Sequence, residues 1–217
     1  MTETIALQRL ETRRCLRLTG IDWQTYSRLL LAFAEKPGVR LTYDRGELEI
    51  MSPLLEHDDD AEVLGMLVWI LTDELGLTIK PGGSTTLRRR KRLRGVEADR
   101  CYWIANAPRM KGRRRLNLRV DPPPDLAIEK DVTNSSLDRM RIYAALRVPE
   151  VWRLADDELT FHHLSPSGNY ALARASLSFP LVTPADLMPF VLEARQAEDQ
   201  NVVMRKFREW IRQRRGS

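Results

Sequence analysis

The chain has 217 residues and a net charge of +5, with 43% hydrophobic and 30% charged residues, which is typical of one globular domain with terminal extensions. Its two cysteines exclude a disulfide framework and a thiolate metal cluster, so a reducing, cytoplasmic location is expected. No apolar run could span a bilayer, and the first ten residues lack the apolar core of a signal peptide, so no membrane partner is expected.

The N-terminal part of the chain predicts a helix followed by a hairpin. From Asp22 to Glu35 apolar residues recur at helical spacing, and Asp22 can serve as the N-cap. Residues 39–43 and 47–51 alternate between apolar and polar side chains around Asp44-Arg45-Gly46. This pattern predicts a β-hairpin with a three-residue loop that contains glycine.

The middle of the chain predicts one long helix and several short strands. Residues 56–75 carry an apolar stripe behind an acidic start, which favours a helix because acidic groups complement the helix dipole. Short strands are expected at residues 77–79, 85–87 and 100–105. Residues 125–132 are largely apolar and predict a strand that is buried on both faces.

The C-terminal part predicts a helix over 136–146, strands over 149–154, 159–164 and 170–173, and helices from Thr183 and over 202–215. The last helix is amphipathic. Its apolar face suits either its own domain or a second subunit, and we favour the subunit contact, which makes a homodimer a candidate state. The whole order of elements indicates an α/β (α+β) fold with a mixed sheet flanked by helices.

Basic residues gather in three runs. Six of the seven residues from 88 to 94 are basic, and further runs lie at 113–115 and 205–215. Such runs attract polyanions, although solvated loops and helix faces would also carry them. The nucleic-acid contacts predicted on this basis are Arg88, Arg89, Arg90, Lys91, Arg113 and Arg114.

One acidic residue interrupts the apolar strand 125–132. A buried carboxylate is costly unless it is paired or binds a metal. Strand alternation places Glu129 and Asp131 on one face and Lys130 on the other. Asp99 begins the preceding strand, so pairing of the two strands would bring Asp99 and Glu129 together, which suits a hard cation such as Mg²⁺ or Mn²⁺. An ion pair between Glu129 and an arginine is the alternative.

Several motifs stand in a fixed order between residues 23 and 164: 43–53, Glu56-His57, 83–88, 97–99, 123–129, 142–143 and 148–152. In that order they resemble the bacterial Uma-type restriction-endonuclease-like family of the PD-(D/E)XK nuclease superfamily. The resemblance implies a restriction-endonuclease-like core with an N-terminal helix and hairpin. It also implies metal-dependent hydrolysis of phosphodiester bonds in DNA, with Asp99 and Glu129 as the two metal ligands and Glu56 as the acid on the long helix.

The sequence departs from the family pattern at two places. Ala98 stands where proline is usual, and Asp131 stands where a lysine is expected, two residues after the second acid. Loss of such an electrostatic group costs about 10²- to 10³-fold in rate. Arg139, four residues before Tyr143, is the best substitute, since arginine neutralises phosphate, although it is a poor proton acceptor.

The expected catalytic set is therefore Glu56, Asp99, Glu129, Asp131 and Arg139. The alternative is a nuclease-fold protein that binds nucleic acid or a partner protein without efficient cleavage. The expected organisation is an N-terminal extension over 1–20, the restriction-endonuclease-like domain over 21–192 and a basic amphipathic C-terminal helix over 193–217.

Overall fold

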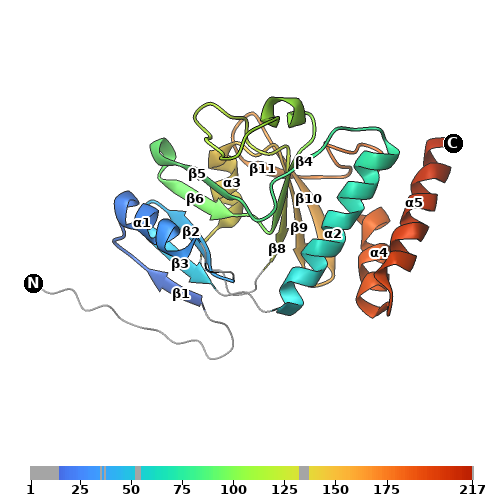
Figure 1. Cartoon of the computed structure of the whole chain (residues 1–217), viewed down its shortest axis with the longest axis horizontal. Coiled ribbons are helices and arrows are strands. Elements are labelled where there is room, and N and C mark those ends of the chain that lie inside the picture. The colour runs from blue at the N-terminus through green and yellow to red at the C-terminus, as the bar shows by residue number, and fades with distance from the viewer. Residues whose placement is uncertain (1–14, 35, 37, 52–54, 132–136, 217) are drawn as a thin grey trace, which may run out of the picture.

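The structure is a computed structural model that describes residues 15–216 except 35, 37, 52–54 and 132–136, and the side chains of 55–58 are also outside the description. It contains two β-sheets (Figure 1). The smaller sheet is antiparallel throughout, in the order β1 (Cys15–Leu18), β3 (Glu47–Met51), β2 (Arg40–Asp44), β6 (Arg94–Glu97) and β5 (Thr86–Arg89).

The larger sheet is mixed, as the sequence predicted. Its order is β11 (Tyr170–Ala173), β10 (Glu158–Leu164), β9 (Glu150–Ala155), β8 (Leu126–Lys130), β7 (Arg100–Trp103) and β4 (Lys80–Pro81). Only the β8–β9 pair is parallel. The helices are α1 (Trp23–Phe33), α2 (Leu55–Glu74), α3 (Arg139–Leu146), α4 (Pro184–Gln196) and α5 (Gln200–Gly216), with short 3₁₀ helices η1 (Arg90–Arg92) and η2 (Ala107–Met110).

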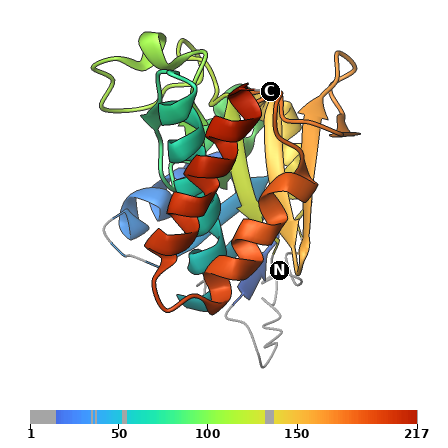
Figure 2. The same ribbon diagram turned by 90° about the vertical axis from the view of Figure 1, so that its right-hand side faces the viewer.

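Helix α3 packs between the two sheets, and three other helices cover the other face of the larger sheet. Helix α3 contacts β5 and β6 of the smaller sheet, while α2, α4 and α5 pack together on the opposite face of the larger sheet (Figure 2). Strand β8 is buried along nearly its whole length because it has a layer on each face. Within the described residues, no helix is both long and apolar enough to cross a membrane.

Three local predictions differ from the structure. The hairpin loop has two residues rather than three, because Asp44 pairs with Glu47 and only Arg45 (φ 48°) and Gly46 (φ 100°) lie between. Two left-handed residues make the tight turn whose twist suits paired strands. Helix α3 begins at Arg139, after Asp138 accepts a hydrogen bond from the Arg141 amide at 3.0 Å.

The third difference concerns the expected strands at 77–79 and 85–87. The first is displaced to Lys80–Pro81 and the second to Thr86–Arg89, and they lie in different sheets. Strand β6 was not expected, because its sequence Arg-Gly-Val-Glu lacks a clear alternation.

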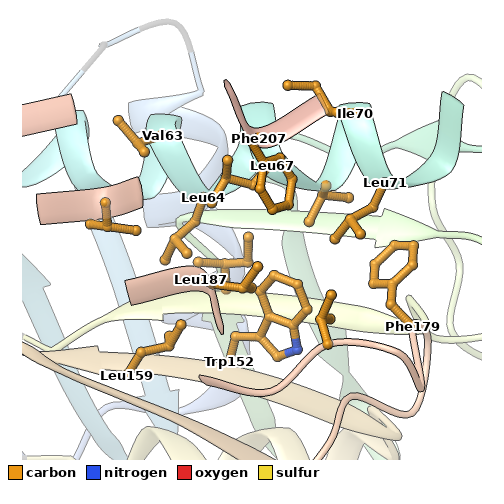
Figure 3. Packing of buried hydrophobic residues seen from close by; sticks show 14 of the residues in the cluster. Val63, Leu64, Leu67, Ile70, Leu71, Trp152, Leu159, Phe179, Leu187 and Phe207 are labelled. Carbon is orange, nitrogen blue, oxygen red and sulfur yellow. The ribbon is translucent and has the colours of Figure 1, made fainter. Parts of the chain in front are cut away.

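The C-terminal helices complete the main core of the domain. Phe207 and Ile211 of α5 are fully buried in one cluster with Leu64 and Leu67 of α2 and Leu187 of α4 (Figure 3). The expected subunit contact of this apolar face is therefore wrong, because the face is covered by its own chain. The sequence could not distinguish packing on the same domain from packing on a second subunit, because an amphipathic stripe does not identify its packing partner.

Asp60 ties α2 to β8 and α4. Its carboxylate pairs with Lys130 Nζ at 2.6 Å and with Arg195 Nε at 2.7 Å. Burial alone would raise the pKa of Asp60, but the hydrogen bonds and charges of Arg195 and Lys130 lower it below the ordinary value. The charged carboxylate is therefore the form that stabilises the fold.

We expect Asp60→Asn to lower the free energy of unfolding by about 2 kcal/mol, because it leaves the half-buried Lys130 without its counter-ion. A depressed carboxyl pKa contributes stability that is present above the unfolded pKa and is lost as the pH falls through the folded pKa. Urea unfolding at neutral pH and at acid pH measures both effects. Equal losses at the two pH values would contradict the assignment.

A buried carboxylate cluster as the candidate active site

Asp99 lies where the chain crosses from one sheet to the other. Strand β6 ends at Glu97 and β7 begins at Arg100, so Ala98 and Asp99 form the crossing. In the antiparallel β7–β8 ladder Arg100 is opposite Ile128, and one further step places Asp99 opposite Glu129. Opposed side chains of such a pair share a face. The structure thus brings Asp99 and Glu129 to the same end of the larger sheet.

Both carboxylates are almost completely buried. Asp99 and Glu129 each retain 4% of their accessible surface. Asp99 accepts a hydrogen bond from the Lys130 amide at 2.7 Å and pairs with the guanidinium group of Arg40. Glu129 accepts a hydrogen bond from the hydroxyl group of Tyr143. Each acid is therefore held in one orientation by a neighbour from another element.

Arg139 connects the smaller sheet to β8. Its Nη1 lies 3.0 Å from Glu129 Oε2, and its Nη2 donates to the backbone carbonyl of Glu97 at 2.7 Å. Burial disfavours the charged guanidinium group, but the carboxylates of Glu129, Glu49 and Glu97 outweigh this and raise its pKa. Its Nε is buried and has no partner among the described residues. An unsatisfied buried donor at this place is suited to a ligand or a water molecule.

Two acids of the site hold their protons more tightly than usual. Burial raises the pKa of Glu129, and Arg139, Tyr143 and Arg40 oppose this without cancelling it. Burial likewise raises the pKa of Glu97, against a hydrogen bond from Thr86 and the charge of Arg40. Perturbed carboxyl groups that lie together are typical of functional sites.

We call Glu49, Glu97, Asp99 and Glu129 the carboxylate cluster. Glu49 is fully buried, and its charge acts on Arg139. With all four acids ionised, the cluster and the two arginines that face it, Arg40 and Arg139, have a formal charge of −2. A divalent cation would balance this charge, and carboxylate oxygens are the donors that Mg²⁺ and Mn²⁺ prefer. The donors are therefore of the chemical type that such an ion prefers.

The acids are not arranged as a complete metal site in this structure. No group of three or more His, Cys, Asp or Glu within the described part of the chain could hold a metal ion. Glu56, the expected third acid, has its backbone in the first turn of α2, but its side chain lies outside the described residues.

A cleft of about 750 Å³ reaches Glu97 at the edge of the cluster, whereas Asp99 and Glu129 do not line it. Apolar residues of α1 form one side, and Arg40 and Glu97 lie at the cluster itself. Further basic residues that line the cleft are Lys36, Arg88 and Arg100. Positive walls around a carboxylate would draw a phosphate group toward the buried acids.

The remaining predicted site residues lie elsewhere. Asp131 follows β8 and pairs with Arg153, although its charge still acts on Glu129. Lys130 points to the other face of the sheet, toward Asp60. Among the predicted nucleic-acid contacts only Arg88 lines the cleft; Arg89, Arg90 and Lys91 lie at the β5–η1 tip, and Arg113 and Arg114 lie in an exposed loop.

Three members of the site were not expected from the sequence. Arg40 and Glu49 fall on polar positions of the alternating hairpin pattern, and Tyr143 serves in the sequence only to locate Arg139. The hairpin has a second buried face, because Thr42, Glu49 and Met51 are all buried. The order Leu48, Glu49, Ile50 is the ordinary alternation of a half-buried strand, so it gave no signal of this second buried face.

The larger sheet is mixed, has a central buried strand, is covered by helices and carries two acids at one end of its β7–β8 pair, an arrangement consistent with a restriction-endonuclease-like fold. Residues 23–198 match the model of the Uma2 family, which is described as "Putative restriction endonuclease". The chain therefore belongs to this family, and the resemblance inferred from its motifs is confirmed.

The chain is similar to the crystal structure of a putative nuclease belonging to DUF820 from Anabaena variabilis, with 16% identity and a TM-score of 0.48 over 70% of this chain and 90% of that one. No curated protein gives a significant match.

Proposed function

We propose that this protein is a metal-dependent endonuclease that hydrolyses phosphodiester bonds in DNA. The observation that carries the proposal is the position of two buried acids at one end of the larger sheet, Asp99 just before β7 and Glu129 on β8, near a basic cleft. Membership of a restriction endonuclease family supports the reaction class. The basic residues of the cleft matter to the proposal, because a buried pair of acids that faced only apolar residues would not attract a phosphate group.

Asp99 and Glu129 would hold Mg²⁺ or Mn²⁺, with Glu56 as a further candidate ligand. Such an ion supplies an activated water molecule and neutralises charge on the phosphate. Tyr143 holds the Glu129 carboxylate, and burial raises the pKa of this phenol, so it remains a donor. Arg40 borders both the cluster and the cleft, which suits it to neutralise a phosphate oxygen. Arg139 takes the place of the missing lysine as the fixed positive charge.

The test is incubation of the purified protein with supercoiled plasmid DNA and either Mg²⁺ or Mn²⁺. We expect nicked and linear products that disappear when EDTA is added. Parallel reactions with single-stranded DNA and with RNA define the substrate. Cleavage that continues unchanged in EDTA would overturn the metal requirement, and cleavage of RNA alone would overturn the DNA assignment.

One observation favours a second candidate, a nuclease-fold module that binds nucleic acid without efficient cleavage. Lys130 is paired with Asp60 on the opposite face, and Asp131 is paired with Arg153. Neither position 130 nor position 131 therefore supplies a lysine side chain to the carboxylate cluster. This candidate predicts DNA binding that weakens steeply with salt in protein that shows no metal-dependent turnover.

A further inference from the structure

A second hollow lies at the end of the smaller sheet away from the carboxylate cluster. Its volume is about 860 Å³, and its walls come from the two strand tips at Arg45 and Arg92, from α3 and from the β10–β11 hairpin. Five arginines line it: Arg45, Arg92, Arg94, Arg141 and Arg147. We call this hollow the arginine groove.

The positive charge of the groove is only partly compensated. Arg45 and Arg94 share one carboxylate, that of Asp44, at 3.0 and 2.9 Å. Within the described part of the chain, the guanidinium groups of Arg92, Arg141 and Arg147 have no ion-pair partner, and all three residues are exposed. Among the described residues that line the groove, Asp138 is the only acid, and its side chain caps the backbone of α3. With Asp44 included, five guanidinium groups face two carboxylates, a formal charge of +3.

Two of these arginines occupy unusual backbone positions. Arg45 has φ 48° in the hairpin turn, and Arg147 has φ 66° at the C-cap of α3. Glycine and asparagine adopt this left-handed conformation at less cost than arginine. The backbone of each turn would favour glycine or asparagine at this position. The presence of arginine therefore indicates that its side chain has a function.

We propose that the arginine groove binds the phosphodiester backbone of a nucleic acid at a distance from the carboxylate cluster. Arginine is suited to phosphate because its planar fork donates two parallel hydrogen bonds. The charges are spread along walls from several elements. In the sequence, Arg89, Arg90 and Lys91 directly precede Arg92 of the lining. A line of phosphates matches such a distribution better than a single anion does.

Helix α3 connects the groove to the candidate active site. Arg139 faces the carboxylate cluster, whereas Arg141 and Arg147 face the groove. From Arg139 to Arg147 the helix rises by about 12 Å, which corresponds to about three or four nucleotides of a duplex. A strand of more than about four nucleotides is long enough to span that distance. The inference deepens the proposed function, because the groove would hold another stretch of the polymer that the cluster cuts.

The test is the binding of a fluorescein-labelled DNA duplex of about three helical turns in EDTA, measured by fluorescence anisotropy at several salt concentrations. The variant is Arg92→Gln/Arg141→Gln/Arg147→Asn, in which asparagine tolerates the left-handed backbone of position 147. We expect the Kd to rise at least about tenfold and the slope of log Kd against log salt to fall by about 2 to 3, since each lost phosphate contact removes about 0.9.

The matched control is Arg28→Gln/Arg174→Gln/Arg205→Gln, which removes the same charge from exposed positions outside the groove and the cleft. We expect it to keep the wild-type slope within about 1. A groove variant that behaves like the wild type would overturn the proposal, as would polyglutamate competing as strongly as unlabelled DNA. Because EDTA prevents metal-dependent cleavage, loss of the proposed nuclease activity in a separate assay does not change this result.

Discussion

Asp99→Asn and Glu129→Gln should each lower the rate of metal-dependent plasmid cleavage by about 10²- to 10³-fold. Both substitutions keep the size of the side chain but remove one carboxylate from the pair that faces across β7 and β8. The cluster then loses part of the negative charge that would hold the cation. Nicking rates at saturating Mn²⁺, together with calorimetric titration of Mn²⁺ alone, separate loss of the ion from loss of chemistry.

Asp59→Asn is the matched control for these variants. Asp59 is exposed on α2, and its substitution by asparagine removes the same single negative charge. We therefore expect the Asp59→Asn variant to keep the wild-type rate and the wild-type affinity for Mn²⁺. The midpoint of thermal unfolding shows whether each variant is folded. A folded Glu129→Gln protein that cleaves DNA at the wild-type rate would remove Glu129 from the proposed site.

Arg139→Met should lower the free energy of unfolding by about 3 to 5 kcal/mol at neutral pH. Methionine fills most of the space, so the loss comes from charge rather than from a cavity. The substitution leaves the buried Glu129 without its guanidinium partner, and it also removes the hydrogen bond to the Glu97 carbonyl that joins the two sheets. Urea unfolding followed by circular dichroism measures the change.

The pH dependence of this loss has a definite sign. Burial holds the pKa of folded Glu129 above its ordinary value, so the folded state binds this proton more tightly than the unfolded chain does. The contribution of Glu129 to stability is then fully present below the unfolded pKa and is lost as the pH rises through the folded pKa. Without Arg139 the folded pKa rises further.

The Arg139→Met variant should therefore be closer to the wild type near pH 5 than near pH 8. Arg139→Lys keeps a positive charge beside Glu129 and should lose clearly less stability than Arg139→Met at neutral pH. If the two variants were equally destabilised and showed no dependence on pH, packing rather than charge would be the role of Arg139.

Much of the fold follows from local patterns in the sequence. The long apolar stripe predicted α2, which the structure places at Leu55–Glu74, and the apolar run predicted the buried strand β8. Capping residues gave correct helix starts where the cap is local, as at Asp22 and Thr183. The pattern of apolar residues predicts these elements well because α2 buries one face and β8 buries both faces.

The separation into two sheets did not follow from the sequence. Strands β5 and β6 are short and rich in arginine and glycine, so neither has an alternation that indicates a partner. An amphipathic stripe also does not show which element packs against it. The contact of α5 with α2 and α4 is therefore seen only in the structure. Strand pairing and helix docking depend on the whole set of neighbours.

For the candidate site, the sequence by itself determined the acids that are expensive to bury. Glu129 interrupts an apolar strand, and Asp99 stands at the start of the strand before it. Burial of a carboxylate requires a partner wherever the chain folds. Only the tertiary structure decided what those partners are. Arg40, Glu49 and Tyr143 come from a hairpin and a helix that are distant in the sequence, and only packing of the two sheets around α3 brings them to Asp99 and Glu129.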